Sequence, residues 1–290
     1  MALNQKNFTL LSDTRLPQDL LWKLNFLWLC FEDDSNEKDT LHFDLFHKVP
    51  SLEYLIVQKW FGLKEIFPSQ KLQVHHNVLA GLKQLFLFQL SELECIGLEH
   101  AWVQPYSQKL ELLKLYECPL VERIVYGAVS FINLKELYVE RCEKMEYLFT
   151  FATLKSLVKL ETLFIENCES IKEIARNEEE DGCDEMVFGR LRWIYLICLP
   201  RLISFYSGNA TLQCPCLEWV VVDECPNMIT FSEGLIKLPI FSGIQTSKHP
   251  DFTFHVDLNT TVQTLFHEKV SSYVLLHYYF LSCVIKSSFS

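Results

Sequence analysis

The sequence predicts an α/β solenoid, an open horseshoe with a parallel β-sheet on its concave side and short, irregular segments on its convex side. Three observations support this fold class. A phrase with the spacing L-x-x-L-x-L occurs eight times, at intervals of 24 to 31 residues. Within each copy, side chains follow the two-residue period of a strand. Several copies also place cysteine three residues after the second strand hydrophobe. Together these features are the signature of leucine-rich repeats.

The repeat that opens at Leu134 shows how one unit is built. Leu137 and Val139 point inward, Tyr138 between them points outward, and Met145 adds to the core from the following turn. One unit cannot bury these groups alone, but parallel stacking covers them and pairs the strand backbones. The eight copies open at Leu24, Leu52, Leu82, Leu110, Leu134, Leu160, Leu191 and Leu217.

The regular pattern ends after Gly234, which sets the expected domain boundaries. We expect an N-terminal lead or cap over 1–19, about eight repeats over 20–235, and a C-terminal cap with a loosely ordered tail over 236–290. A cap is expected because the last repeat otherwise exposes its core edge. Residues Thr260 to Val270 have the pattern of a short amphipathic helix.

The convex segments vary in length and character. Residues Phe151 to Lys159 predict a helical stretch that buries one face, formed by Leu154, Leu157 and Val158. Two acidic insertions, 32–39 and 177–185, lack the alternating oxygen ligands and glycine turn of a calcium loop. We therefore interpret both insertions as solvated loops.

Composition excludes several classes of function. The 290 residues are 49% hydrophobic and have a net charge of −11, without the clustered basic charge that nucleic-acid binding needs. The apolar stretch Val274 to Ile285 is shorter than the roughly 20 residues that span a bilayer. Residues Met1 to Asp19 lack a secretory signal. These observations predict a cytoplasmic protein, with the nucleus or the inner face of the plasma membrane as alternative locations.

The cysteines point to structure rather than to chemistry. One cysteine occurs at the same position of four repeats, which predicts buried thiols instead of the closely paired thiols of a zinc site. Buried thiols are inert, and no nucleophile with a neighbouring base is evident. We therefore expect no catalytic residue, no metal and no cofactor in this chain. The four cysteines are Cys118, Cys142, Cys168 and Cys225.

Three longer phrases identify a family resemblance. Residues Cys168 to Ile174 (CESIKEI), Leu199 to Phe205 (LPRLISF) and Cys225 to Gly234 (CPNMITFSEG) resemble the C-terminal leucine-rich repeats of plant intracellular disease-resistance proteins of the coiled-coil, nucleotide-binding class. The resemblance covers about residues 20–235. It implies a sensor or regulatory module of innate immunity, whose repeats also restrain a nucleotide-binding switch.

One part of the family pattern is missing from this sequence. No G-x-x-x-x-G-K-[ST] phosphate loop occurs, so ATP or ADP binding cannot be assigned to any residue. The chain is then a fragment of a longer receptor, a truncated gene product or a free-standing repeat protein. A substrate adaptor for ubiquitin ligation and a fragment without function of its own are the alternative interpretations.

The outward strand positions form the predicted binding surface. Aromatic residues are unusually frequent there, and large exposed apolar patches mark interaction sites. We expect a protein partner: a pathogen effector, a guarded host protein, or a nucleotide-binding switch domain in cis or in trans. Cover by another domain and lateral packing among the rings are the alternatives, and nearby carboxylates favour a basic partner. The candidate residues are Trp28, Tyr54, Phe86, Phe88, Tyr116, Tyr138, Phe164, Trp193, Tyr195 and Trp219.

Overall fold

The computed structural model describes most of the repeat region. The described residues are 2–4, 17–31, 46, 48–67, 79, 81–98, 104–126, 129–176, 185–246, 251 and 257–267. The first acidic insertion, all but the last residue of the second, and the apolar segment Val274 to Ile285 lie outside them.

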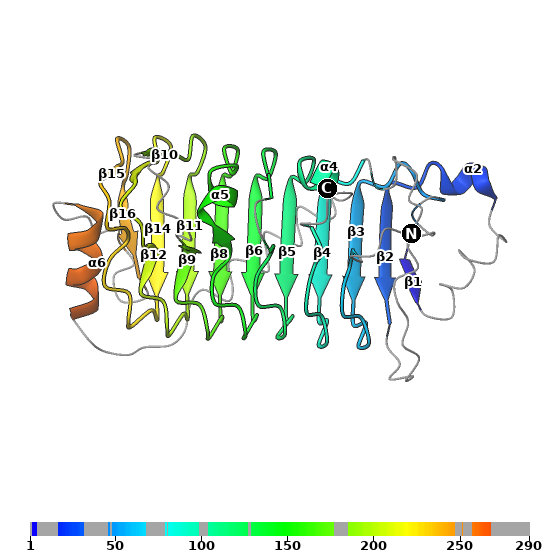
Figure 1. The fold of residues 1–290 in the computed structure, drawn as a ribbon, viewed down its shortest axis with the longest axis horizontal. Helices are drawn as coiled ribbons and strands as arrows, with labels where there is room; N and C mark the ends of the chain where they lie inside the picture. The colour runs from blue at the N-terminus through cyan, green and yellow to red at the C-terminus, as the bar shows by residue number, and fades with distance from the viewer. Residues whose placement is uncertain are drawn as a thin grey trace.

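One long parallel sheet runs the length of the described chain (Figure 1). Within the described residues it has ten strands, in the order β1-β2-β3-β4-β5-β6-β8-β11-β14-β16. Eight of these strands have five residues, and each begins two residues after one of the predicted leucine openings. The leucine-rich-repeat solenoid is therefore confirmed. The strands are β1 (Ala2–Asn4), β2 (Phe26–Cys30), β3 (Tyr54–Gln58), β4 (Gln84–Phe88), β5 (Leu112–Tyr116), β6 (Glu136–Glu140), β8 (Thr162–Glu166), β11 (Trp193–Ile197), β14 (Trp219–Asp223) and β16 (Gly243–Gln245).

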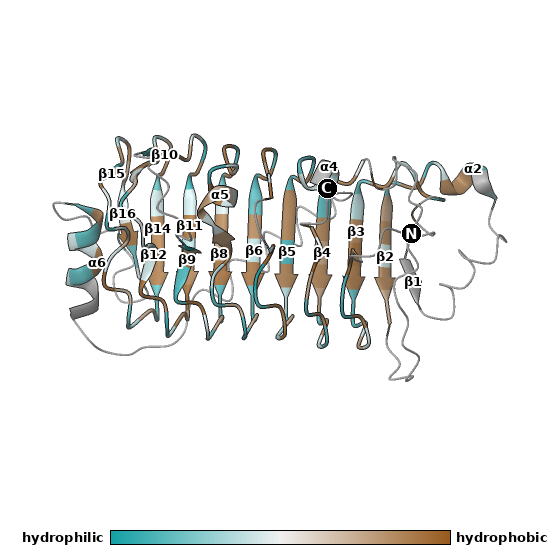
Figure 2. Ribbon diagram, viewed as in Figure 1, coloured by the Kyte–Doolittle hydropathy of each residue, from teal (hydrophilic) through white to brown (hydrophobic). Residues whose placement is uncertain are grey.

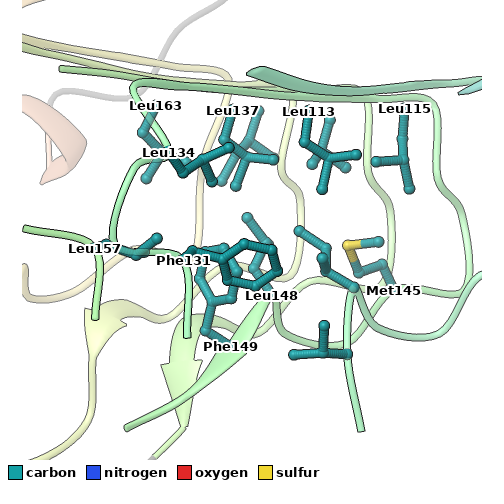
Figure 3. Packing of buried hydrophobic residues seen from close by; sticks show 14 of the residues in the cluster. Leu113, Leu115, Phe131, Leu134, Leu137, Met145, Leu148, Phe149, Leu157 and Leu163 are labelled. Atoms are coloured by element: carbon teal, nitrogen blue, oxygen red, sulfur yellow. The ribbon is translucent and has the colours of Figure 1, made fainter. Parts of the chain in front are cut away.

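The core lies behind this sheet and is continuous from repeat to repeat. Leu113, Leu137 and Leu163 are in register on neighbouring strands and are buried. Figure 3 shows this row facing Phe131 and Phe149, which come from the opposite wall of the solenoid. Each Å² of apolar surface that is buried contributes about 25 cal/mol, so such contacts are the main stabilising contribution. Each repeat is thus held by its two neighbours.

Two small parallel sheets and four short helices, among the described residues, complete the fold. One sheet has the order β12-β9-β7 and the other β10-β13-β15. Figure 2 shows that the centres of the long strands are hydrophobic, whereas the turns that connect them are mixed or polar. The remaining elements are α2 (Gln18–Leu21), α4 (Gln104–Ser107), β7 (Phe149–Thr150), α5 (Phe151–Leu154), β9 (Glu173–Arg176), β10 (Glu185–Val187), β12 (Ser204–Tyr206), β13 (Thr211–Gln213), β15 (Ile236–Lys237) and α6 (Leu258–His267).

The long sheet extends past the predicted range of 20–235 at both ends. Strand β1 pairs with β2, and β16 pairs with β14. Helix α6 occupies the position of the helix predicted over 260–270 and lies against β16, with Leu258 and Val262 buried. Its first turn is capped by Asp257, whose Oδ1 accepts a hydrogen bond of 2.8 Å from the amide of Thr260. This helix covers the C-terminal edge of the core.

The predicted helical face at Leu154, Leu157 and Val158 is partly wrong. Helix α5 ends at Leu154, and the chain continues in tight turns in which the amide of Leu157 donates to the carbonyl of Leu154. Leu154 and Leu157 are buried, but the Val158 side chain is 46% exposed. The three-residue spacing of these turns, instead of a continuous helix, directs Val158 to solvent.

A ladder of alternating charge runs along the edge where the strands begin. The residue after each opening leucine pairs by backbone hydrogen bonds with its counterpart in the next repeat, as in Lys83 N–H to Glu53 O at 2.9 Å. Ion pairs join Lys83 to Glu53 at 2.8 Å and Lys135 to Glu111 at 2.6 Å, and a further pair joins Arg192 to Glu218. The row reads Glu53, Lys83, Glu111, Lys135, Glu161, Arg192 and Glu218.

Charge reversal in this ladder should be destabilising. The substitution Lys135→Glu places three carboxylates on successive repeats, and we expect it to lower the free energy of unfolding by about 1 kcal/mol. Lys135→Gln, which removes the ion pair without adding repulsion, should cost less. Chemical denaturation at low and high salt measures both effects. The difference between the variants should shrink in high salt because mobile ions screen the repulsion. Equal stabilities at low salt would contradict the ladder.

A left-handed residue follows each strand of the long sheet from β3 to β14. None is glycine, although side chains rarely adopt this backbone conformation, and each φ lies between 50° and 55°. Hydrogen bonds to the next repeat favour the turn: the amide of Lys59 donates to the carbonyl of Phe88 at 2.9 Å, and that of Arg141 to Glu166 at 3.0 Å. The residues are Lys59, Gln89, Glu117, Arg141, Asn167, Cys198 and Glu224.

The four repeat cysteines are buried, as predicted, directly after these left-handed residues. Their thiols donate to backbone carbonyls, for example Cys168 Sγ to Glu166 O at 3.4 Å and Cys225 Sγ to Leu196 O at 3.4 Å. Burial raises the pKa of the Cys118 thiol to about 12. These thiols therefore close the turns, and the Cys118 thiol stays protonated at neutral pH.

Candidate protein-interaction surface

The outward side chains of the long sheet form three parallel rows, which we call the sheet face. It is the face that the sequence predicts as concave. The middle row contains Trp28, Ile56, Phe86, Lys114, Tyr138, Phe164, Tyr195 and Val221, one from each five-residue strand. On either side lie the first residues of the strands, from Phe26 to Trp219, and the last residues, from Cys30 to Asp223. The sheet register thus brings all ten candidate residues onto one surface.

The part of the sheet face over β2 to β5 is mainly apolar, with Phe26, Ile56 and Leu112 among its outward residues. Trp28 is 37% exposed, and its indole Nε1 donates to Gln58 Oε1 at 3.1 Å. Phe88 packs against two other candidates, with ring centroids 6.0 Å from Phe86 and 6.3 Å from Tyr116. These rings remain half-buried, so part of each is open to a partner.

An ion pair divides the sheet face near its middle. Lys114 Nζ lies 2.7 Å from Glu140 Oε1, and both side chains are more than four-fifths buried. The same ammonium lies 5.2 Å from the ring centroid of Tyr138, in cation–π contact. Tyr138 donates its hydroxyl to Glu136 at 2.7 Å, and burial raises the pKa of that hydroxyl above its usual range. These contacts hold the side chains of Lys114, Tyr138 and Glu140 in place.

The part over β8 to β14 has a buried apolar centre. Phe164, Ile197 and Val221 form a small cluster on this face, against which Tyr138 and Tyr195 pack. Phe164 is only 3% exposed because its ring centroid lies 5.9 Å from that of Tyr138 and 5.5 Å from that of Tyr195. The prediction that Phe164 itself offers contact surface therefore differs from the structure, in which Phe164 supports its neighbours.

Two tryptophans form the rim beside this centre. The ring centroids of Trp193 and Trp219 are 5.7 Å apart. Glu218 accepts a hydrogen bond from Trp193 Nε1 at 3.2 Å, and the Arg192 guanidinium lies 4.6 Å from the Trp193 ring. Hydrogen bonding from Arg192 holds the pKa of Glu218 below its usual value. The Trp193 ring is thus oriented from both sides while remaining half-buried.

Carboxylates surround the opposite side of the cluster. Asp223 and Glu166 end their strands, and Glu224 accepts a hydrogen bond of 3.1 Å from the thiol of Cys198. Burial and these carboxylates raise the pKa of Cys198 to about 12. Sequence reasoning missed Ile197, Cys198 and Glu224. Ile197 has the same strand position as Phe88 and Tyr116, which could have indicated it.

The described residues contain no helix long and apolar enough to cross a membrane, and no group of three or more potential metal ligands. The rings pack laterally, which was one of the alternatives, but several keep accessible surface.

Comparison with known families identifies the repeats. Residues 109–233 match the family model described as plant disease resistance protein RPS2-like, leucine-rich repeats. No curated protein matches the chain. The matched segment runs from the residues just before β5 to the turn beyond β14, and the same sheet continues on its N-terminal side through β4, β3 and β2. Residues 109–233 are thus similar to the RPS2-like family of plant disease-resistance leucine-rich repeats.

Proposed function

We propose that the sheet face is a protein-recognition surface and that the chain is the sensor or regulatory part of a plant innate-immunity receptor. The main support is the alignment of half-buried aromatic rings on consecutive repeats, such as Phe88 with Tyr116 and Trp193 with Trp219. Aromatic side chains of this kind are enriched among the residues that dominate binding energy. The family match over 109–233 supports the immune role.

The charges on the sheet face favour a basic partner. Glu140 is paired with Lys114, and the carboxylates around Ile197 contribute negative charge on the side of the cluster opposite Trp193 and Trp219. Complementary charge steers association and suppresses wrong partners. The partner, whether a pathogen effector, a guarded host protein or a nucleotide-binding switch domain, would therefore present a basic, partly apolar surface to the sheet face.

The double substitution Trp193→Ala with Tyr195→Ala tests this proposal. Both side chains are half-buried on the sheet face, whereas the core residues Ile194 and Leu196 stay in place. We expect the fold to persist and the affinity for a sheet-face partner to fall at least 30-fold, since a hot-spot residue contributes about 2 kcal/mol or more. Circular dichroism checks the fold.

Three baits would identify the partner by quantitative affinity capture from plant tissue. They are the parent chain, the double variant, and Val158→Ala, which changes an exposed side chain away from the sheet face. Partners should be captured by the parent and the Val158 variant and lost with the double variant. Each is then purified and its Kd measured. Equal capture on all three baits would place recognition elsewhere.

A further inference from the structure

A groove runs along the edge of the long sheet where the strands end, marked by the arrowheads in Figure 1. Its volume is about 740 Å³, and five consecutive repeats line it. Each repeat contributes its left-handed residue and the residue two positions later. We call this the strand-exit groove; its lining residues are Lys59, Phe61, Gln89, Ser91, Glu117, Pro119, Arg141, Glu143, Asn167 and Glu169.

The dimensions of the strand-exit groove fit an extended polypeptide. Paired strands lie about 4.8 Å apart, so five repeats span roughly 19 Å. An extended chain rises about 3.3 Å per residue, so about six residues cover that length. Phe61, which is 39% exposed, and Pro119 give the groove apolar contact surface. A compact ligand would touch only part of it.

The middle of the strand-exit groove is electrostatically satisfied. Gln89 Nε2 donates to Glu117 Oε2 at 2.9 Å, and Arg141 Nη1 donates to Glu117 Oε1 at 2.9 Å. Burial disfavours the Glu117 carboxylate, but the hydrogen bonds from Gln89, Tyr116 and Arg141 outweigh it, so its pKa lies below the usual value. The central charges therefore compensate each other.

The two ends of the strand-exit groove have opposite charges. Lys59 lies at one end, three repeats from Glu143 and four from Glu169. Among the described residues, none of these three side chains forms an ion pair, and both glutamates are exposed. One end therefore attracts an acidic group and the other a basic group. A nucleic acid or another polyanion would be repelled by the two carboxylates.

We propose that the strand-exit groove binds an extended segment of a partner protein, with an acidic residue at the Lys59 end and a basic residue at the Glu143 and Glu169 end. The spacing of the repeats sets about four to six residues between the two charges. This surface adjoins the last row of the sheet face, where Tyr116 hydrogen-bonds to Glu117, but its lining includes none of the ten aromatic candidates. The proposal therefore goes beyond the function proposed above.

A selection from a displayed library of random 12-residue peptides tests the proposal. The baits are the full parent chain and a charge-swapped variant with Lys59→Glu, Glu143→Lys and Glu169→Lys. The parent should enrich peptides with an acid and a base four to six residues apart in one fixed order, and the swapped variant the opposite order. A synthetic peptide with the parent's enriched sequence should bind Glu143→Gln, Glu169→Gln at least about fivefold more weakly than the parent.

The Trp193→Ala, Tyr195→Ala chain separates this groove from the sheet face, because it should enrich the same peptides as the parent. Several results would overturn the proposal: no enrichment on the parent, enrichment without the charge pair, the same charge order on parent and swapped baits, or loss of enrichment in the sheet-face variant. If circular dichroism shows that the swapped variant does not fold, the variant Glu143→Gln, Glu169→Gln provides the test. Unchanged affinity of this variant for the peptide would then reject the groove as the binding site.

Discussion

Truncating Leu163 to alanine should lower the free energy of unfolding by about 3 kcal/mol. The Leu163 side chain is 1% exposed and is in register with Leu137 and Ile194 on the neighbouring strands. Its removal forfeits apolar burial and leaves a cavity that the flanking strands cannot close, because their backbones are fixed by hydrogen bonds on both sides. Urea denaturation followed by circular dichroism measures the loss.

Val158→Ala is the matched control for this experiment, since it removes apolar atoms only five positions away, at a position that is 46% exposed. It should change stability by no more than about 0.5 kcal/mol. Similar losses for the two variants would show that Leu163 is not in the core and that the strand register is wrong.

Replacing Gly97 by alanine should cost about 3 kcal/mol, an effect as large as that of the core truncation. Gly97 has a φ of +81°, in the left-handed region, and a Cβ placed there would lie 2.0 Å from the carbonyl oxygen of Phe67. The left-handed conformation alone costs an alanine about 1–2 kcal/mol. The clash with a backbone atom adds to this, because Phe67 is itself bound to the next repeat through the carbonyl of Ile96.

Gly189→Ala provides the comparison. The nearest atom to a Cβ at Gly189 is 3.8 Å away, so the variant should be close to neutral or slightly stabilising, through the lower entropy of its unfolded chain. Thermal unfolding of both variants tests the difference. If Gly97→Ala unfolds at the same temperature as the parent, the backbones at Gly97 and Phe67 do not approach each other this closely.

The strands could be predicted from sequence, but the turns that follow them could not. The spacing of Leu163 and Ile165 determines which side chains are buried, so period and register follow from the pattern of hydrophobic residues along the sequence. The left-handed turns involve Lys59, Gln89 and Glu117, which are not residues that favour this conformation. It is imposed by hydrogen bonds to the next repeat, between residues 23 to 30 positions apart. Local sequence has no signal for it.

The sequence predicts which residues lie on the candidate surface, but not how deeply each side chain is buried. Alternation places Trp28 and Phe164 in the same row, yet Trp28 is 37% exposed and Phe164 only 3%. The difference arises because Phe164 has aromatic neighbours on both sides, at Tyr138 and Tyr195, and Trp28 lies near the end of the row. The strand-exit groove had no sequence signal, because its lining is chemically mixed and is defined only by the stacking of the repeats.

The alternating row at the strand-entry edge restricts how this array can change length. From Glu53 to Glu218 each repeat differs in sign from the one before it. Deleting any single internal repeat of this stretch would join two like charges, and duplicating one in tandem would do the same. Deleting or duplicating two adjacent repeats keeps the alternation intact. The smallest unit that can be exchanged without this repulsion is therefore a pair of repeats, so unequal recombination between related genes would be tolerated best in steps of two.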